Sequence, residues 1–185
     1  VVVKFLFLVI GIAGLLIFIL WLGLYIQPAF FPPDGTSVIS AGTIPLADSL
    51  PSPVKNFYSK VFGSEIPRIE SAIISGRAKL RIMGISFPAR FQFFHKAGKA
   101  YHHNIELTFF GFPIMKVREY YQHGAVRLEL PFGTVENEPN VDQGANLALW
   151  GEAIWYPSVF LSDPEVRWKP VDSETAMLEI PFREQ

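Results

Sequence analysis

One apolar stretch near the start of the chain, Phe5–Ile26, reads FLFLVIGIAGLLIFILWLGLYI. It contains no charged side chain and no Asn, Gln, Ser, Thr or Pro. As an α-helix it would be roughly 33 Å long, which is enough to cross a hydrocarbon core about 30 Å thick. A core helix of a soluble protein seldom has so long an uninterrupted apolar run. We therefore expect a transmembrane helix over residues 5–26.

A cleaved signal peptide is the main alternative for this stretch. Such a peptide has an apolar region of about 7–15 residues that ends in small side chains. Here the run is longer, and it continues into the bulky residues Tyr25, Phe30 and Phe31. Lys4 is the one basic residue before the stretch, and the next is Lys55. The positive-inside rule then predicts a single-pass protein with a cytoplasmic N-terminus and an extracytoplasmic domain.

The composition limits the classes of function. The chain has 16 basic and 17 acidic residues, and only Lys4 precedes residue 27, so the remainder carries 15 basic and 17 acidic side chains. A nucleic-acid surface needs clustered basic charge, so we predict no nucleic-acid partner. The absence of Cys excludes disulfides, thiolate metal sites and a Cys nucleophile. No phosphate-binding or nucleophile motif appears, and we predict no cofactor.

Three segments follow from the chain's composition. Residues 5–26 form the transmembrane helix, and residues 27–49, rich in Pro and Gly, form a linker. Residues 50–185 form the folded domain, and we expect further strands beyond Gln185, because the last predicted strand ends only three residues earlier. Because the folded pattern begins at Leu50, we expect the apolar helix to be structurally separate from the domain.

The domain begins with an amphipathic helix and continues as strands. Ser52 and Pro53 suit a helix start and Gly63 a helix stop, with apolar residues between them at helical spacing. Apolar and polar residues then alternate in segments separated by Gly and Pro turns. The predicted strands cover residues 71–82, 89–95, 100–110, 114–122 and 125–130.

A loop over residues 134–140 precedes a second helical region, residues 141–161, which Pro157 interrupts. Short strands are expected at residues 166–169 and 175–182. Strands that follow one another through short turns, without helices between them, indicate an antiparallel sheet. We therefore predict an α+β fold in which a curled antiparallel sheet, a half-barrel, packs on one or two helices.

A set of residues in the second half resembles a known family. Glu152, Trp155, Tyr156 and Pro157 form a Glu-x-x-Trp-Tyr-Pro signature, which Val166-Arg167-Trp168 follows. The signature resembles an uncharacterised bacterial family of unknown function, some of whose members are membrane-anchored, over about residues 50–182. Many members carry an Arg four residues before the Glu, where this chain has Ala148, so an Arg–Glu pair of that kind does not carry over. The strand and helix order is also similar to the half-barrels of lipoprotein carriers.

Two groups of polar residues are candidates for chemistry. His95 with His102 or His103, together with Glu106 or Glu119, would form a mononuclear metal site. Adjacent histidines on a strand point to opposite faces, and the spacing matches no metal signature, so we predict no metal. Glu152 lies among apolar residues, where a carboxyl group can have a raised pKa and act as an acid or base. The alternative for Glu152 is a structural role, in which it hydrogen-bonds the backbone or an arginine of the sheet such as Arg77, Arg81, Arg90 or Arg118.

Three functional hypotheses remain open. The first is a membrane-anchored protein that binds a lipid or another apolar ligand on the concave face of its sheet. Its predicted ligand-binding residues are Trp150, Glu152, Trp155, Tyr156 and Phe160. The second is a structural or assembly protein with a filled core, and the third is an enzyme that uses Glu152 with a His or Arg of the sheet. The sequence favours binding over catalysis and predicts membrane lipid as a partner.

Overall fold

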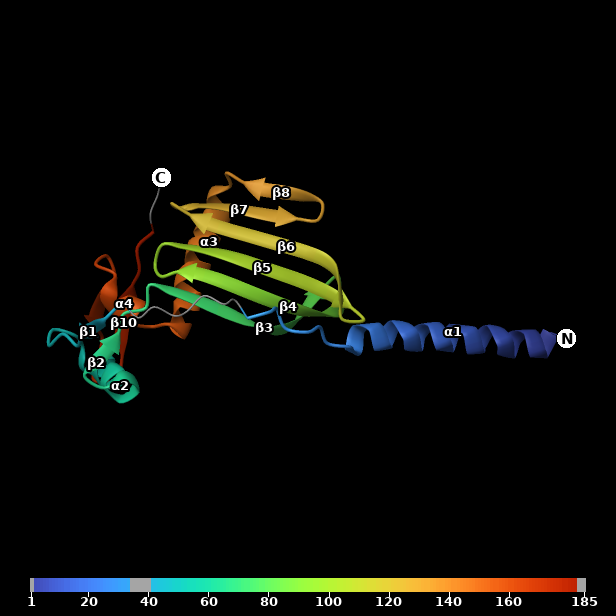
Figure 1. The fold of residues 1–185 in the computed structure, drawn as a ribbon, viewed down its shortest axis with the longest axis horizontal. Coiled ribbons are helices and arrows are strands. Elements are labelled where there is room, and N and C mark those ends of the chain that lie inside the picture. The colour runs from blue at the N-terminus through green and yellow to red at the C-terminus, as the bar shows by residue number, and fades with distance from the viewer. Residues whose placement is uncertain (1, 34–40, 183–185) are drawn as a thin grey trace.

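A computed structural model describes residues 2–33 and 41–182 of the chain (Figure 1). It begins with α1, Val2–Tyr25, an apolar helix long enough to cross a membrane. Helix α1 is consistent with a single membrane span or with a signal sequence. The rest of the described chain forms an α+β domain built around one antiparallel sheet.

Six consecutive strands form this sheet in the order β3-β4-β5-β6-β7-β8. The strands are β3, Ser71–Ile82; β4, Ile85–Lys96; β5, Ala100–Phe109; β6, Phe112–Gln122; β7, Ala125–Leu130; and β8, Gly133–Glu136. Every neighbouring pair is antiparallel. The alternation in the sequence and the short turns therefore predicted the sheet type and the strand connectivity correctly.

The predicted curl of the sheet is wrong. The sheet is open, with β3 and β8 at opposite edges (Figure 1). Strong curvature usually requires bulges or glycine kinks at several places. Among the paired strands of this sheet, the register shifts between Leu107 and Thr108 alone. One irregularity leaves the sheet flat enough to accept a helix on one face, and the half-barrel analogy fails for this reason.

The prediction also missed one strand and placed the start of another too late. The loop expected over residues 134–140 begins instead with β8, which pairs with β7. This strand has four residues and one inward apolar side chain, Val135, which is too short a pattern to recognise. Strand β4 begins before the predicted residue 89 and includes Pro88, whose carbonyl oxygen accepts a hydrogen bond from Thr108 Oγ1 at 3.0 Å.

Helices and two short two-stranded sheets cover one face of the main sheet and extend past its end (Figure 1). These elements are β1, Thr43–Pro45; α2, Ser52–Phe62; β2, Glu65–Pro67; α3, Pro139–Glu152; η1, Ala153–Trp155; α4, Val159–Ser162; β9, Arg167–Pro170; and β10, Ala176–Glu179. Strand β1, which lies within the expected linker, pairs with β2. The main core joins Tyr101 and Tyr121 of the sheet to Leu149 and Trp150 of α3.

The expectation that α1 is structurally separate from the domain is wrong. The Gly23 carbonyl oxygen accepts a hydrogen bond from the Phe110 N–H at 2.9 Å. Gly23 itself packs on the ring of Phe109, where a Cβ atom would lie 2.3 Å from Cε2. Beyond α1, the guanidinium groups of Arg77 and Arg90 lie over the rings of Phe30 and Phe31, respectively. The end of α1 and the segment after it are therefore part of the folded unit.

A substitution at Tyr58 tests whether its hydrogen bond holds α2 on the domain. Its side chain is buried, and its hydroxyl group donates a hydrogen bond to the Pro157 carbonyl oxygen at 2.7 Å. Tyr58→Phe leaves that carbonyl without its partner, so we expect a loss of about 1–3 kcal/mol in the free energy of unfolding. Urea unfolding of the full chain in detergent, followed by tryptophan fluorescence, measures the change. Tyr120→Phe, at a half-buried position on the opposite sheet face, is the control, and an equal loss in both variants would contradict this role.

Candidate metal centre

The β4–β5 hairpin brings two histidines to the same face of the sheet. His95 is paired with Tyr101 across the hairpin, and His103 lies two residues beyond Tyr101 on β5. His95 and His103 are therefore diagonal neighbours, a spacing that long side chains bridge on one face of a sheet. Their ring centroids are 5.5 Å apart.

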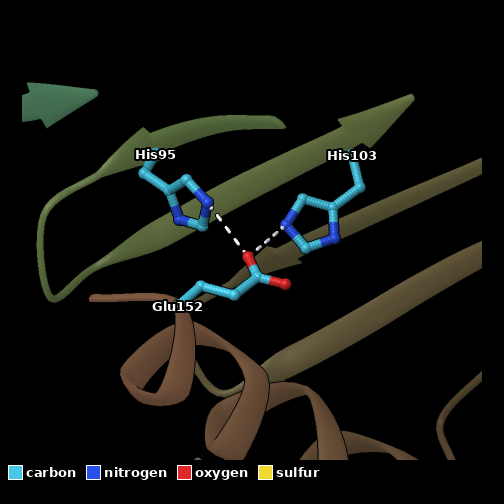
Figure 2. Close-up of side chains that lie close together, drawn as sticks. All are labelled: His95, His103 and Glu152. Carbon is cyan, nitrogen blue, oxygen red and sulfur yellow. Dashed lines mark ion pairs between the residues drawn. The ribbon is translucent and has the colours of Figure 1, made fainter. Parts of the chain in front are cut away.

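Glu152, the last residue of α3, completes the cluster from the other side (Figure 2). Its Oε2 atom lies 3.0 Å from His95 Nε2 and 3.0 Å from His103 Nε2. One carboxylate oxygen therefore faces two imidazole nitrogens. The side chains of His95 and His103 are 0% and 4% exposed, and that of Glu152 is 27% exposed, so solvent reaches the cluster from the side of the helix.

Aromatic rings hold the two imidazoles in place. The His103 ring is stacked between Phe93, with centroids 3.9 Å apart, and Tyr101, with centroids 4.0 Å apart. The His95 ring lies 5.3 Å from that of Tyr156, which follows η1. Such packing restricts the rotation of both imidazoles. The nitrogens that face Glu152 are therefore fixed by the fold, and the site is preorganised.

The facing atoms make no hydrogen bonds with one another, although they are close. His95 Nε2, His103 Nε2 and Glu152 Oε2 are all buried without a hydrogen-bond partner, and so is His95 Nδ1. An unsatisfied buried polar group costs about 1–3 kcal/mol, so native structures rarely collect several at one point. A water molecule or a metal ion between the three residues would satisfy these atoms.

A second carboxylate supports His103 from behind. Glu119, directly opposite His103 on β6, places Oε2 3.8 Å from His103 Nδ1. The Tyr101 hydroxyl group donates a hydrogen bond to Glu119 Oε1 at 2.5 Å and orients this carboxylate. Metal-bound histidines generally direct their second nitrogen to a carboxylate, a carbonyl or water. Glu119 occupies that position.

The charges of the cluster are strongly coupled. Burial opposes ionisation of Glu152, but His103 and His95 outweigh it and lower the pKa of the carboxyl group to about 2. Burial likewise favours neutral His103, but Glu119 and Glu152 raise the pKa of its imidazole above the ordinary value. The raised pKa considered for Glu152 from its apolar neighbours is therefore wrong, because these neighbours in sequence do not include the two histidines.

The geometry suits one metal ion. Atoms that bind a common ion at about 2.0–2.2 Å lie roughly 3.0–3.5 Å from one another. The Glu152 oxygen lies 3.0 Å from each of the two imidazole nitrogens. The three candidate ligand atoms all lie within 4.8 Å of one another. Two imidazoles and a carboxylate suit Zn²⁺ and Fe²⁺ better than Ca²⁺ or Mg²⁺, which prefer oxygen ligands.

The other titratable residues of the sequence prediction lie elsewhere. His102 is on the opposite face of the sheet, stacked between Phe94 and Tyr120, as the alternation along the strand predicted. Glu106 is on that face too, and it pairs with Arg90 at 2.6 Å and Lys116 at 2.9 Å. The sequence left a His or an Arg of the sheet open as the partner of Glu152, and in the described chain Glu152 faces two histidines.

The five predicted ligand-binding residues do not share one surface. Glu152 faces the sheet and Tyr156 is buried near His95, whereas Trp155 is 70% exposed. Trp150 and Phe160 pack together in the core with centroids 6.3 Å apart. These two line an apolar groove of about 670 Å³ between α2, α3 and the β9–β10 hairpin.

The sequence suggested His95 and His103 as metal ligands together with Glu106 or Glu119. It separately suggested a His or Arg of the sheet as the partner of Glu152 in an enzyme. The hairpin spacing carries the signal for the pair, since eight residues around a tight turn place both on one face. Glu152 is 49 positions beyond His103, and only the docking of α3 on the sheet brings it there. Local pattern alone gives no signal for that contact.

The comparisons with known proteins place the chain in a family of unknown function, as its sequence signature suggested. Residues 42–185 match the model of DUF6544, a family of unknown function. No curated protein and no solved structure matches the chain. Because the matched region spans most of the sequence, the chain belongs to the DUF6544 family.

Proposed function

We propose that this protein is a membrane-anchored metalloprotein that holds one divalent transition-metal ion between His95, His103 and Glu152. The observation that carries the proposal is the convergence of three buried ligand atoms without hydrogen bonds among them. A hydrogen-bonded ion-pair cluster would align an N–H with the carboxylate. A shared ion instead requires lone pairs directed at one point.

The charge of the site supports a cation. Two carboxylates, Glu119 and Glu152, face His103, and the pKa values of both are lowered, so both favour the charged form. Glu152 also stands at the C-terminal end of α3, where the helix dipole disfavours an anion and favours a cation. No basic residue occupies the last turn of α3. A divalent ion balances both the carboxylates and the helix end.

The number of protein ligands favours catalysis over a purely structural role. Structural zinc sites are closed by four protein ligands, whereas catalytic sites use three and keep a position for water or substrate. The described cluster supplies three. An ion held this way activates a bound water or polarises a carbonyl or phosphoryl oxygen. We therefore propose metal-assisted catalysis, which develops the enzyme hypothesis based on Glu152.

Metal binding is tested directly by titration. We expect the full chain, purified in detergent and stripped with chelator, to bind one equivalent of Zn²⁺ or of Fe²⁺ under anaerobic conditions. His103→Ala and Glu152→Gln each remove a ligand, so binding should fall at least 100-fold. Isothermal titration calorimetry and elemental analysis of the dialysed protein measure affinity and stoichiometry.

His102→Ala is the matched control for this titration. It removes the same side chain one position away, on the face of the sheet opposite Glu152. Its metal affinity should equal that of the unchanged protein. Absence of binding by the unchanged protein, or equal losses for His102→Ala and His103→Ala, would contradict the proposed site.

Glu119 should increase the affinity of the site for the metal ion without being a ligand itself. Loss of a carboxylate behind a metal-bound histidine typically costs 10–100-fold in metal affinity. We expect Glu119→Gln to retain the stoichiometry of one ion and to lose affinity by about that factor. Glu129→Gln is the control, because Glu129 on β7 pairs with Arg127 at 3.2 Å instead. Unchanged affinity in Glu119→Gln would remove Glu119 from the site.

The proposal includes retention of α1 as a single membrane span. A cleaved signal peptide has no structural role in the mature domain, whereas Gly23 is buried against Phe109 and bonded to Phe110. Trp21 and Tyr25, near the C-terminal end of α1, suit a membrane interface. Lys4 favours a cytoplasmic N-terminus and an extracytoplasmic domain.

A second candidate function is the binding of a lipid or another apolar ligand. The groove between α2, α3 and the β9–β10 hairpin supports it, because about 670 Å³ is within the range of small-molecule sites and the lining is mostly apolar. Its walls include Phe57, Ile154 and Leu178. The groove is separate from the metal cluster, although α3 contributes to both.

The groove is tested by the lipid that the purified protein retains. We expect native mass spectrometry and solvent extraction of the full chain to recover a bound lipid. Ile154→Arg places a charge on the groove wall at a position that is 65% exposed, so the fold tolerates it and ligand retention falls. Trp155→Arg, the neighbouring exposed residue, is the control. Equal recovery from both variants would exclude the groove as the binding place.

A further inference from the structure

The meander places alternate turns at opposite ends of the sheet. The β3–β4 and β5–β6 turns lie at one end, because Ile82 is paired with Ile85 and Phe109 with Phe112. Helix α1 leaves the domain from this end, where Gly23 bonds to Phe110 (Figure 1). The β4–β5 turn and the histidine cluster lie toward the other end.

The two turns next to α1 carry large apolar side chains that the fold leaves uncovered. Met83 is 98% exposed and Phe112 is 74% exposed, and Ile85 and Ile114 beside them are also exposed. Turns are ordinarily polar, and an apolar cluster rimmed by polar groups marks an interaction surface. The core does not use these residues, so folding alone does not explain them.

Basic side chains lie just behind the apolar turn residues. On β3, Lys79 and Arg81 are exposed, and Arg81 is two positions from Met83. On β6, Lys116 is exposed two positions beyond Ile114. Apolar side chains that project beyond a row of Lys and Arg are typical of surfaces that enter the headgroup layer, where anionic lipids attract the basic groups.

We propose that the β3–β4 and β5–β6 turns insert into the interface of the same bilayer that α1 spans, with Met83 and Phe112 as the inserting side chains. The hydrogen bond from the Phe110 N–H to the Gly23 carbonyl oxygen holds the β5–β6 turn at the end of the membrane span. Lipid is therefore the group that this surface contacts. The proposal rests on α1 being a membrane span. It adds that the domain is held at a fixed orientation instead of moving freely on a tether.

The β7–β8 turn lies outside this proposal. Phe132 at its tip is 97% exposed, but β7 pairs with the middle of β6, where Glu129 is opposite Arg118. That turn is therefore set back by several residues from the β5–β6 turn. The inserting surface is confined to the two turns that adjoin α1.

The chain has no Cys, so single-cysteine spin labels test the insertion without background. Met83→Cys, Phe112→Cys, Leu16→Cys and Met177→Cys are labelled with a nitroxide in the full chain, reconstituted in phosphatidylcholine–phosphatidylglycerol vesicles. Collision rates with oxygen and with a water-soluble nickel chelate report the depth of each label. Leu16 is the reference within the span, and Met177 on β10 is the control at the opposite end of the molecule (Figure 1).

We expect the ratio of oxygen to nickel collisions at positions 83 and 112 to be several-fold higher than at position 177 and lower than at position 16. Ratios at 83 and 112 equal to that at 177 would place the turns in water and overturn the proposal. Low collision rates with both reagents would show that protein covers the turns, which would also overturn it. A label at position 16 that reports water would instead refute the membrane span itself.

Discussion

The contact of one Glu152 oxygen with two buried imidazoles is the constraint on which the arrangement of the domain depends. The sheet holds His95 and His103 in fixed positions through hairpin pairing and ring stacking. Helix α3 must then stop within reach of them, and it ends at Glu152 before η1 turns the chain. Without a group that satisfies the three ligand atoms, the fold would carry several buried unsatisfied polar atoms at one point, each costing about 1–3 kcal/mol. That cost is difficult to explain as packing alone, because an apolar residue in place of Glu152 would avoid it.

Patterns within one strand or hairpin could be predicted from the sequence, and contacts between distant elements could not. Alternation gave the sheet and placed His102 and His103 on opposite faces, because a strand has a period of two wherever it lies. It also allowed His95 and His103 as a pair. The role of Glu152 depends on the position of α3 along the sheet, which core residues such as Leu149 and Tyr121 determine together. The prediction of a curled sheet was wrong for a related reason. The curvature of a sheet depends on bulges, and these leave little signal in a single sequence.

Attachment of α1 to the sheet could not be predicted because it depends on a close approach at a glycine. Gly23 looks like any other small residue of an apolar helix, yet the Phe109 ring occupies the space where its side chain would be. The residues after α1 continue this contact on the face of the sheet opposite α3, where Phe31 meets Arg90 and Arg90 bonds to Glu106. Residues 27–33 therefore pack on the sheet, where Phe30 and Phe31 make cation–π contacts with Arg77 and Arg90.

On the proposals above, the two ends of the molecule would have different functions. The strands run away from α1 (Figure 1), and about six residues of β5 separate His103 from the turn region next to Gly23, which is roughly 20 Å at the rise of a strand. On the proposed placement, the candidate metal centre lies inside the domain, away from the bilayer surface. A reacting group must then be dissolved or must extend from the membrane to reach the ion. The apolar groove lies on α3 beside this centre, with Trp150 and Gly151 on its wall and Glu152 next in sequence. A ligand whose apolar part fills the groove would place its polar end near the last turn of α3. Glu152, in the same turn, faces the proposed metal site. The two candidate functions are therefore compatible, and the shared helix turn is where they would meet.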